Sequence, residues 1–166
     1  VTTNDIDRLI STYTHNHGHR CATLGYAGQH GPYPKSCCTS INDVICHGIP
    51  DDYVLQDGDI VNVDITTIVN GWHGDQSETF VIGDISREAR GVTQASHDCL
   101  YMAIDAIKPG GKISDIGDAI VTEARRRGFS VVQEYIGHGL GREFHQKPNI
   151  PHVPTRQSRY ERIEPG

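Results

Sequence analysis

The order of the expected elements places this chain in the α+β class: a helix, then strands, then two helices and a further strand. Three observations predict this order. Apolar residues recur at helical spacing near the start, an Asn-Gly pair divides two runs of strand composition, and two capped helical segments follow. With 166 residues, 36% of them apolar and 22% charged, the chain is large enough for one domain with a hydrophobic core.

The first helix is predicted over residues 2–16. Thr2 or Thr3 is expected to cap it, because a threonine hydroxyl accepts the unpaired backbone N–H groups of the first turn. Residues 27–40 begin rich in glycine and proline and are predicted to form a loop that leads into an extended stretch. The apolar face expected for the helix consists of Ile6, Leu9, Ile10 and Tyr13.

Strand composition extends over residues 59–83 on both sides of Asn70-Gly71, the strongest short-range hairpin signal in the chain. A two-residue turn there places Val69 opposite Trp72. Along the first strand apolar and polar residues alternate, so one face packs against a core and the other is polar. The apolar set is Val61, Val63 and Ile65, and the polar set is Asn62, Asp64 and Thr66.

This register brings two carboxylates to the polar face. Asp64 lies opposite Ser77, and Asp75 shares the face as a diagonal neighbour, with backbones roughly 7–8 Å apart. Carboxylates at this spacing can flank a pair of divalent cations. The alternative is an ordinary solvated face of an antiparallel sheet, although aspartate is disfavoured in strands. His73 projects to the face of Asp75 if the register holds, but it is not assigned as a ligand.

Two helices and a strand follow the hairpin. Ser86 is expected to cap the first helix, which runs to about Ile107, where Lys-Pro-Gly-Gly ends it. Ser114 is expected to cap the second, which ends at Gly128. Residues 130–137 then have strand composition.

Three histidines are candidates for chemistry. His138 lies between two glycines, which allow close approach of another group, and His145 follows seven residues later. An imidazole beside carboxylates suits transition-metal ions, whereas a single histidine at such a junction is more often structural or exposed. His47 follows Cys46. In an extended chain neighbouring side chains point in opposite directions, so a joint Cys-His site is not expected there.

Composition limits the partners and the cellular compartment that are expected for this protein. The formal net charge of −6 argues against nucleic acid as a partner, and no apolar run reaches the length of a membrane-spanning helix. The five cysteines are odd in number and form no C-x-x-C pair, which favours a reducing, cytoplasmic compartment.

Four stretches in order closely resemble type I methionine aminopeptidase: YPKSCCTSINDVICHGIPD, DGDIVNVDITTIVNGWHGDQSETFVIG, IKPGGKISDIG and YIGHGLGREFH. The resemblance implies a pita-bread fold, in which two α+β halves related by pseudo-twofold symmetry enclose a dinuclear metal site. One catalytic domain would then occupy residues 1–166, with its first half at about 1–85 and its second from about 86. Relative to the family, the first helix and the C-terminal strands are expected to lie outside residues 1–166.

The resemblance also implies roles for individual residues. The metal ligands of the family fall on Asp64, Asp75 and His138, which would hold two divalent ions of Co, Mn, Fe or Zn. His47 matches the histidine near the scissile nitrogen, and His145 the one that stabilises the oxyanion. Since these are three of five expected protein ligands, residues 1–166 alone are expected to bind metal weakly. The methionine side-chain pocket matches Tyr26, Tyr33, Cys38 and Phe144.

The implied activity is removal of the initiator methionine from nascent proteins when the next residue is small. The expected protein is a cytoplasmic monomer that acts on polypeptide N-termini, including at the ribosome, without membrane or nucleic-acid partners. The alternatives are a truncated, non-catalytic pita-bread binding module and a proline-directed peptidase of the same fold. Thr23, in place of a pocket cysteine, and a longer loop at residues 27–32 leave the substrate preference open.

Overall fold

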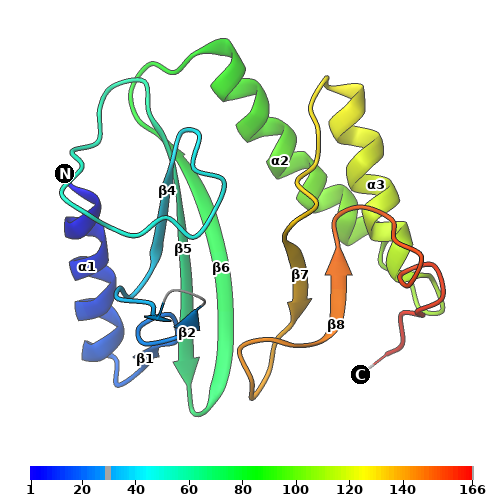
Figure 1. The fold of residues 1–166 in the computed structure, drawn as a ribbon, viewed down its shortest axis with the longest axis horizontal. Coiled ribbons are helices and arrows are strands. Elements are labelled where there is room, and N and C mark those ends of the chain that lie inside the picture. The colour runs from blue at the N-terminus through cyan, green and yellow to red at the C-terminus, as the bar shows by residue number, and fades with distance from the viewer. Residues whose placement is uncertain (29–30, 166) are drawn as a thin grey trace. The chain divides into compact units, whose positions relative to one another are not determined.

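A computed structural model of the protein describes residues 1–28 and 31–165 (Figure 1). The chain forms two compact units. The first contains Val1–Ala89 together with Leu140–Phe144, and the second contains Arg90–Gly139 together with the residues from His145 onward. The short segment at 140–144 therefore belongs to the first unit, although the chain on both sides of it belongs to the second.

The first unit is built on a four-stranded antiparallel sheet with β5 (Ile60–Val69) at its centre. Figure 1 shows β5 and β6 (Trp72–Val81) as a long hairpin, with β4 (Cys38–Ile41) beside β5. The short strand β1 (Arg20–Cys21) also pairs with β5, near the turn. All three partner strands run antiparallel to β5, so the sheet is made from local hairpins and returns.

The predicted hairpin is confirmed residue by residue. Val69 pairs with Trp72 across a turn in which Asn70 and Gly71 have φ of 51° and 80°. Left-handed angles at both turn residues match the right-handed twist of the strands, which explains the Asn-Gly sequence. Two of the three residues expected on the apolar face of β5 are buried, with Val61 1% and Val63 8% exposed, whereas Ile65 is only half-buried.

The first helix, α1 (Thr3–Asn16), is capped by Thr2. The Thr2 hydroxyl accepts the Asp5 N–H, and the Asp5 carboxylate accepts the Thr2 N–H, which completes a capping box. Thr3 has a different function. It is buried, and its hydroxyl contacts both the carbonyl and the backbone N–H of Asp51, which ties the start of the helix to the loop before β5.

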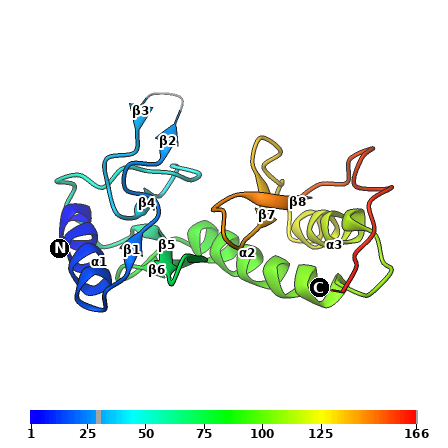
Figure 2. The same cartoon turned by 90° about the horizontal axis from the view of Figure 1, so that it is seen from below.

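The apolar face predicted for α1 is wrong in part. Leu9 and Tyr13 are 69% and 65% exposed, and Ile6 and Ile10 are only half-buried. The helix instead buries small residues such as Thr14, at the end that lies next to β1 (Figure 2). Threonines allow the helix backbone to approach its neighbours closely, a preference that apolar periodicity alone does not reveal.

The loop at residues 27–32 contains β2 (Ala27–Gly28) and β3 (Gly31–Pro32), which pair with each other. Gln29 and His30 lie outside the described residues. The expectation that the longer loop alters the pocket rim therefore stays a prediction.

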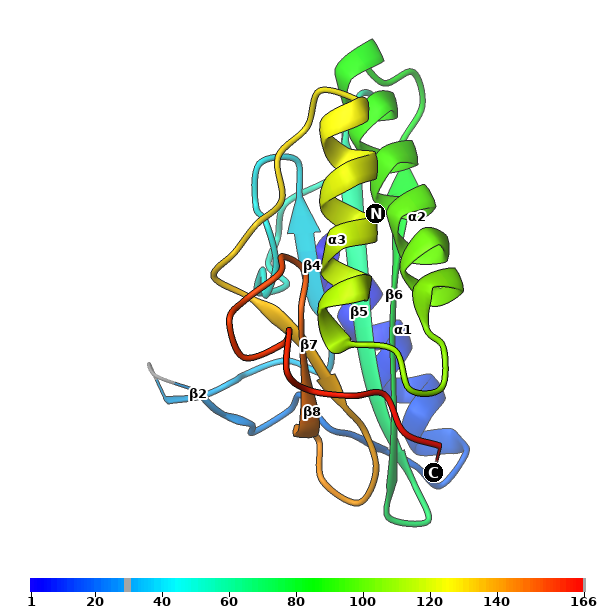
Figure 3. The same cartoon turned by 90° about the vertical axis from the view of Figure 1, so that its right-hand side faces the viewer.

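The second unit contains most of α2 (Arg87–Ala106), followed by α3 (Ile113–Arg126), and Figure 3 shows the two helices side by side. Ser86 caps α2 as predicted, with its hydroxyl accepting a first-turn N–H at 3.0 Å. The buried Cys99 of α2 lies 3.7 Å from the Ile120 carbonyl oxygen of α3. Within the described part of the chain, the helices lack the combination of length and apolar character needed to cross a membrane.

The start of α3 differs from the prediction. Ser114 lies inside the helix, and Lys112 occupies the N-cap position with its N–H donating to the Asp115 carboxylate at 2.8 Å. The Ser114 N–H donates to the Ser158 carbonyl, and the N–H of the preceding residue donates to the Glu161 carbonyl, both at 3.0 Å. A distant part of the chain thus satisfies the first turn, so no side-chain cap is needed.

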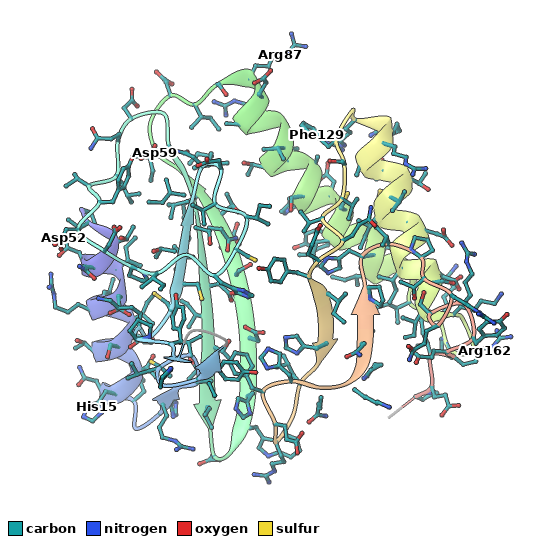
Figure 4. The ribbon with its side chains drawn as sticks, in the orientation of Figure 1. His15, Asp52, Asp59, Arg87, Phe129 and Arg162 are labelled. Atoms are coloured by element: carbon teal, nitrogen blue, oxygen red, sulfur yellow. The ribbon has the colours of Figure 1, made fainter. Side chains whose placement is uncertain are left out.

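The predicted strand at 130–137 is shifted toward the C-terminus. The structure has β7 (Ile136–Gly139) paired with β8 (Gln146–Pro151), a strand that the sequence did not predict and that packs on α3. Before β7, Phe129 follows α3 (Figure 4) and lies so near Gly91 of α2 that an added Cβ would be 3.3 Å from its ring. Glycine at this position lets the ring pack on the helix backbone.

Candidate active site

The hairpin places the two predicted metal-binding aspartates on one face. Asp64 pairs with Ser77 and Asp75 pairs with Thr66, so the two aspartates are diagonal neighbours in the predicted register. Both are half-buried. Carboxylates that converge on one face while remaining accessible form a donor set that suits divalent cations.

Thr66 orients one of these carboxylates, a role that the sequence reading missed. Its side chain is 1% exposed, and its hydroxyl donates to Asp75 Oδ1 at 2.6 Å. The bond fixes one oxygen of the aspartate from the sheet side. The signal was available, because the predicted register already placed Thr66 opposite Asp75.

Strand β4 adds a small apolar wall beside the aspartates. Cys38 pairs directly with Asp64 and is 5% exposed. Burial is the main cause that raises the pKa of the Cys38 thiol to about 11, so the thiol is neutral near pH 7. Burial likewise raises the pKa of Tyr33, whose hydroxyl lies 2.9 Å from the Gly48 carbonyl oxygen. Cys38 and Tyr33 together form this wall, and both present uncharged groups.

His47 lies in a loop with an unusual backbone. Its φ is 57°, so the assumption of an extended chain does not hold at this residue, and the expectation that Cys46 and His47 form no joint site stays a prediction. The cause of this backbone conformation is close packing: Gly48 donates to Ser40 Oγ, and a Cβ on Gly48 would lie 2.2 Å from the Thr39 carbonyl oxygen. The loop is thus pressed onto β4, and His47 takes up the sharp change in direction.

Two predicted pocket residues that are far apart in sequence touch each other. The rings of Tyr26 and Phe144 meet edge to face, with centroids 5.2 Å apart. Phe144 also stacks on His73, at 5.7 Å and an interplanar angle of 18°. His73 and Asp75 are two positions apart on β6 and share a face, so Phe144 lies over the face that carries the aspartates.

The other two predicted histidines belong to the second unit. The rings of His138 and His145 are 4.2 Å apart between centroids. His138 Nδ1 lies 3.0 Å from the Gly139 carbonyl oxygen, which can only accept, so Nδ1 is the donor in this contact. A Cβ on Gly139 would lie 2.4 Å from the Lys147 carbonyl oxygen. The expected close approach to this glycine is real.

The predicted site residues thus form two groups. The first unit holds the aspartates and the pocket residues with His47, and the second holds His138 and His145. Considering only the residues that the structure describes, no three His, Cys, Asp or Glu side chains converge into a metal-binding group. The roles implied for these residues remain predictions.

Comparison with known proteins identifies the family. The sequence matches metallopeptidase family M24 over residues 1–166. It is 48% identical over 167 residues to methionine aminopeptidase A from Synechocystis, covering 100% of this chain and 64% of the relative. It is 45% identical over 160 residues to methionine aminopeptidase from Escherichia coli, covering 95% and 59%. The chain thus spans about three fifths of the length of these curated relatives.

The structural comparison agrees with the sequence. The crystal structure of methionine aminopeptidase from Rickettsia prowazekii superposes with a TM-score of 0.89 at 43% identity, covering 93% of this chain and 61% of that one. This confirms the predicted fold class, an α+β chain of the pita-bread type. Sequence match, identity and fold together establish that the chain belongs to metallopeptidase family M24.

Proposed function

We propose that this protein is a divalent-metal-dependent aminopeptidase that removes an N-terminal methionine when the next residue is small. The observation that carries the proposal is the face of the hairpin, where Asp64 and Asp75 converge beside the uncharged wall at Cys38. Membership of a metallopeptidase family implies divalent metal ions. The relatives named methionine aminopeptidase, at 45% and 48% identity, support the substrate class.

Asp64, Asp75 and His138 are proposed as three of the protein ligands of two ions of Co, Mn, Fe or Zn. The donor set fits this group, because carboxylate oxygens and an imidazole bind such ions well. When bound, the ions would supply an activated water and a Lewis acid for the scissile carbonyl. Thr66 holds Asp75 in one orientation through its 2.6 Å hydrogen bond.

The proposed pocket selects the methionine side chain. Tyr26 and Phe144 supply an aromatic corner, and Tyr33 and Cys38 supply a neutral wall. Apolar surface with a polarisable sulfur contact suits a thioether. Because burial raises the pKa of Cys38 to about 11, the thiol stays neutral and the pocket does not carry the cost of a buried charge.

The two remaining histidines would act on the scissile bond. His145 would donate a hydrogen bond to the carbonyl oxygen as it gains negative charge. His47 would contact the scissile nitrogen, which must take up a proton when the peptide bond breaks. The products are free methionine and a polypeptide that starts with a small residue.

The biological setting is proposed on the same basis. The substrates would be N-termini of nascent polypeptides, including those at the ribosome, and the protein would act as a cytoplasmic monomer. A non-catalytic binding module is the alternative. It is disfavoured because the aspartates, His47, His138 and His145 are all present, and loss of chemistry would remove the selection that retains them.

The test is release of methionine from Met-Ala-Ser by protein of verified intact mass, assayed with Co²⁺, Mn²⁺, Fe²⁺ and Zn²⁺ in turn. We expect metal-dependent release that stops on chelation, and much slower release from Met-Leu-Ser. A protein that binds Met-Ala-Ser but releases no methionine with any of these ions would support the binding module instead.

A further inference from the structure

The segment Leu140–Phe144, here called the latch, is fastened to the β5–β6 hairpin in the first unit. The His73 N–H donates to the Gly141 carbonyl at 2.9 Å. His73 Nδ1 lies 3.1 Å from the same oxygen, and because a carbonyl only accepts, Nδ1 must donate. One residue of β6 therefore satisfies both lone pairs of a buried latch carbonyl.

The latch makes a second set of contacts with the hairpin, at its turn. Arg142 Nη1 donates to the Asn70 carbonyl at 2.9 Å, and its guanidinium lies 4.3 Å above the centroid of the Trp72 ring. A Cβ on Gly71 would lie 2.7 Å from the same guanidinium nitrogen. The Asn-Gly turn therefore serves two purposes, since it closes the hairpin and leaves room for the arginine.

The latch contains Phe144, one of the residues of the proposed methionine pocket. Phe144, its last residue, is packed between the edge contact with Tyr26 and the stacked ring of His73. The bond from His73 Nδ1 to the latch carbonyl fixes the rotation of the imidazole, so the ring face that meets Phe144 is held in place. The orientation of the phenylalanine thus depends on a histidine that is outside the proposed pocket and ligand sets.

We propose that His73 is a positioning residue for the methionine side chain, and that it acts through Phe144. The inference rests on the proposed function, because it assigns the substrate side chain to the pocket at Phe144. Stacking fixes the phenylalanine ring before substrate arrives, which lowers the cost of ordering it on binding. The hydrogen bond to Gly141 orients the imidazole of His73, and the face of this ring then holds Phe144 in place by stacking.

Two variants separate these contacts. His73→Phe keeps a ring against Phe144 and loses the side-chain donor, whereas His73→Asn keeps a donor near the position of Nδ1 and loses the ring. Because aromatic pairs contribute modestly beyond their buried area, we expect His73→Asn to raise KM for Met-Ala-Ser about 3- to 10-fold, with kcat changed less than about twofold. His73→Phe is expected to raise KM less than His73→Asn does, because it keeps a ring against Phe144 but loses the hydrogen bond that orients the ring.

Selectivity distinguishes positioning from general damage to the fold. The kcat/KM ratio of Met-Ala-Ser to norvaline-Ala-Ser should fall in His73→Asn, because the longer side chain depends more on Phe144. A loosened fold would lower kcat/KM for both peptides by the same factor and leave their ratio unchanged. His97→Asn is the matched control, since His97 also contacts an aromatic ring, that of Tyr101 at 4.9 Å, but on α2.

Each outcome decides one question. Unchanged KM and selectivity in His73→Asn, or equal impairment of His73→Phe and His73→Asn, would overturn the positioning role while the aminopeptidase activity stands. A wild-type protein that hydrolyses neither peptide would refute the proposed function, and this inference with it, before any variant is compared.

Discussion

Thr66→Val tests whether the hydrogen bond from Thr66 orients Asp75, a proposed metal ligand. Valine keeps the branched shape of threonine but removes the hydroxyl that donates to Asp75 Oδ1 at 2.6 Å. Because Thr66 is 1% exposed, water has little access to replace the lost donor from the sheet side. The carboxylate then gains rotational freedom, and a metal that binds to it must restore the order.

The expected loss of metal affinity in Thr66→Val can be estimated from the strength of the hydrogen bond that is removed. Hydrogen bonds to charged groups contribute about 1.5–3 kcal/mol, but Asp75 is half-buried and can be partly rehydrated, which favours the lower end. About 1.5 kcal/mol corresponds to roughly a tenfold weaker metal affinity, within the usual range of about 10- to 100-fold for the loss of such supporting partners.

The assay is calorimetric titration of the metal-free protein with Mn²⁺, together with urea unfolding to monitor stability. Thr67→Val is the matched control, because Thr67 is the next residue on β5, points to the opposite face and pairs with Gly74. Equal Mn²⁺ affinities in the two variants would refute the assigned role of Thr66. A tenfold loss confined to Thr66→Val would support it.

Three further predictions concern the hairpin and the second unit. Asp75→Asn should abolish metal-dependent methionine release with little loss of fold, and unchanged kinetics would contradict the ligand role. Gly71→Ala should lower the free energy of unfolding by about 1–2 kcal/mol, because Gly71 has a φ of 80°; an unchanged urea midpoint would argue against this. The Arg126 and Arg127 guanidinium groups lower the pKa of Glu123 to about 2 from 4.5, so its contribution to stability is present above pH 4.5 and is lost as the pH falls through about 2. Glu123→Gln should flatten the stability profile in this acidic range, as measured by urea unfolding at a series of pH values, and an equally steep profile would count against the assignment.

Local signals in the sequence predicted the hairpin and the helix cap at Ser86, and they limited the cap of the first helix to Thr2 or Thr3, of which Thr2 is the cap. Asn70-Gly71 fixes the register through its own backbone angles, and once the register is known the shared face of the two aspartates follows. Such features depend on residues a few positions apart, which is why one sequence suffices to find them.

Features that depend on distant chain segments could not be predicted in this way. Ser114 looks like a helix cap, but the Ser158 carbonyl receives its N–H, and no local pattern encodes that partner. The left-handed backbone at His47 results from packing against Thr39, and the contact between Tyr26 and Phe144 requires the latch to be in place. The resemblance to a family supplied these residues as candidates, and only the structure shows what touches them.

The placement of Trp72 has a practical consequence for spectroscopy. It is the single tryptophan of the chain, and its ring lies under Arg142 at 4.3 Å. Intrinsic fluorescence therefore reports on one locus, the seating of residues 140–144, whereas circular dichroism is dominated by the helices, most of which lie in the second unit. Comparing the two signals during unfolding would show whether the units melt together or in sequence, without any label.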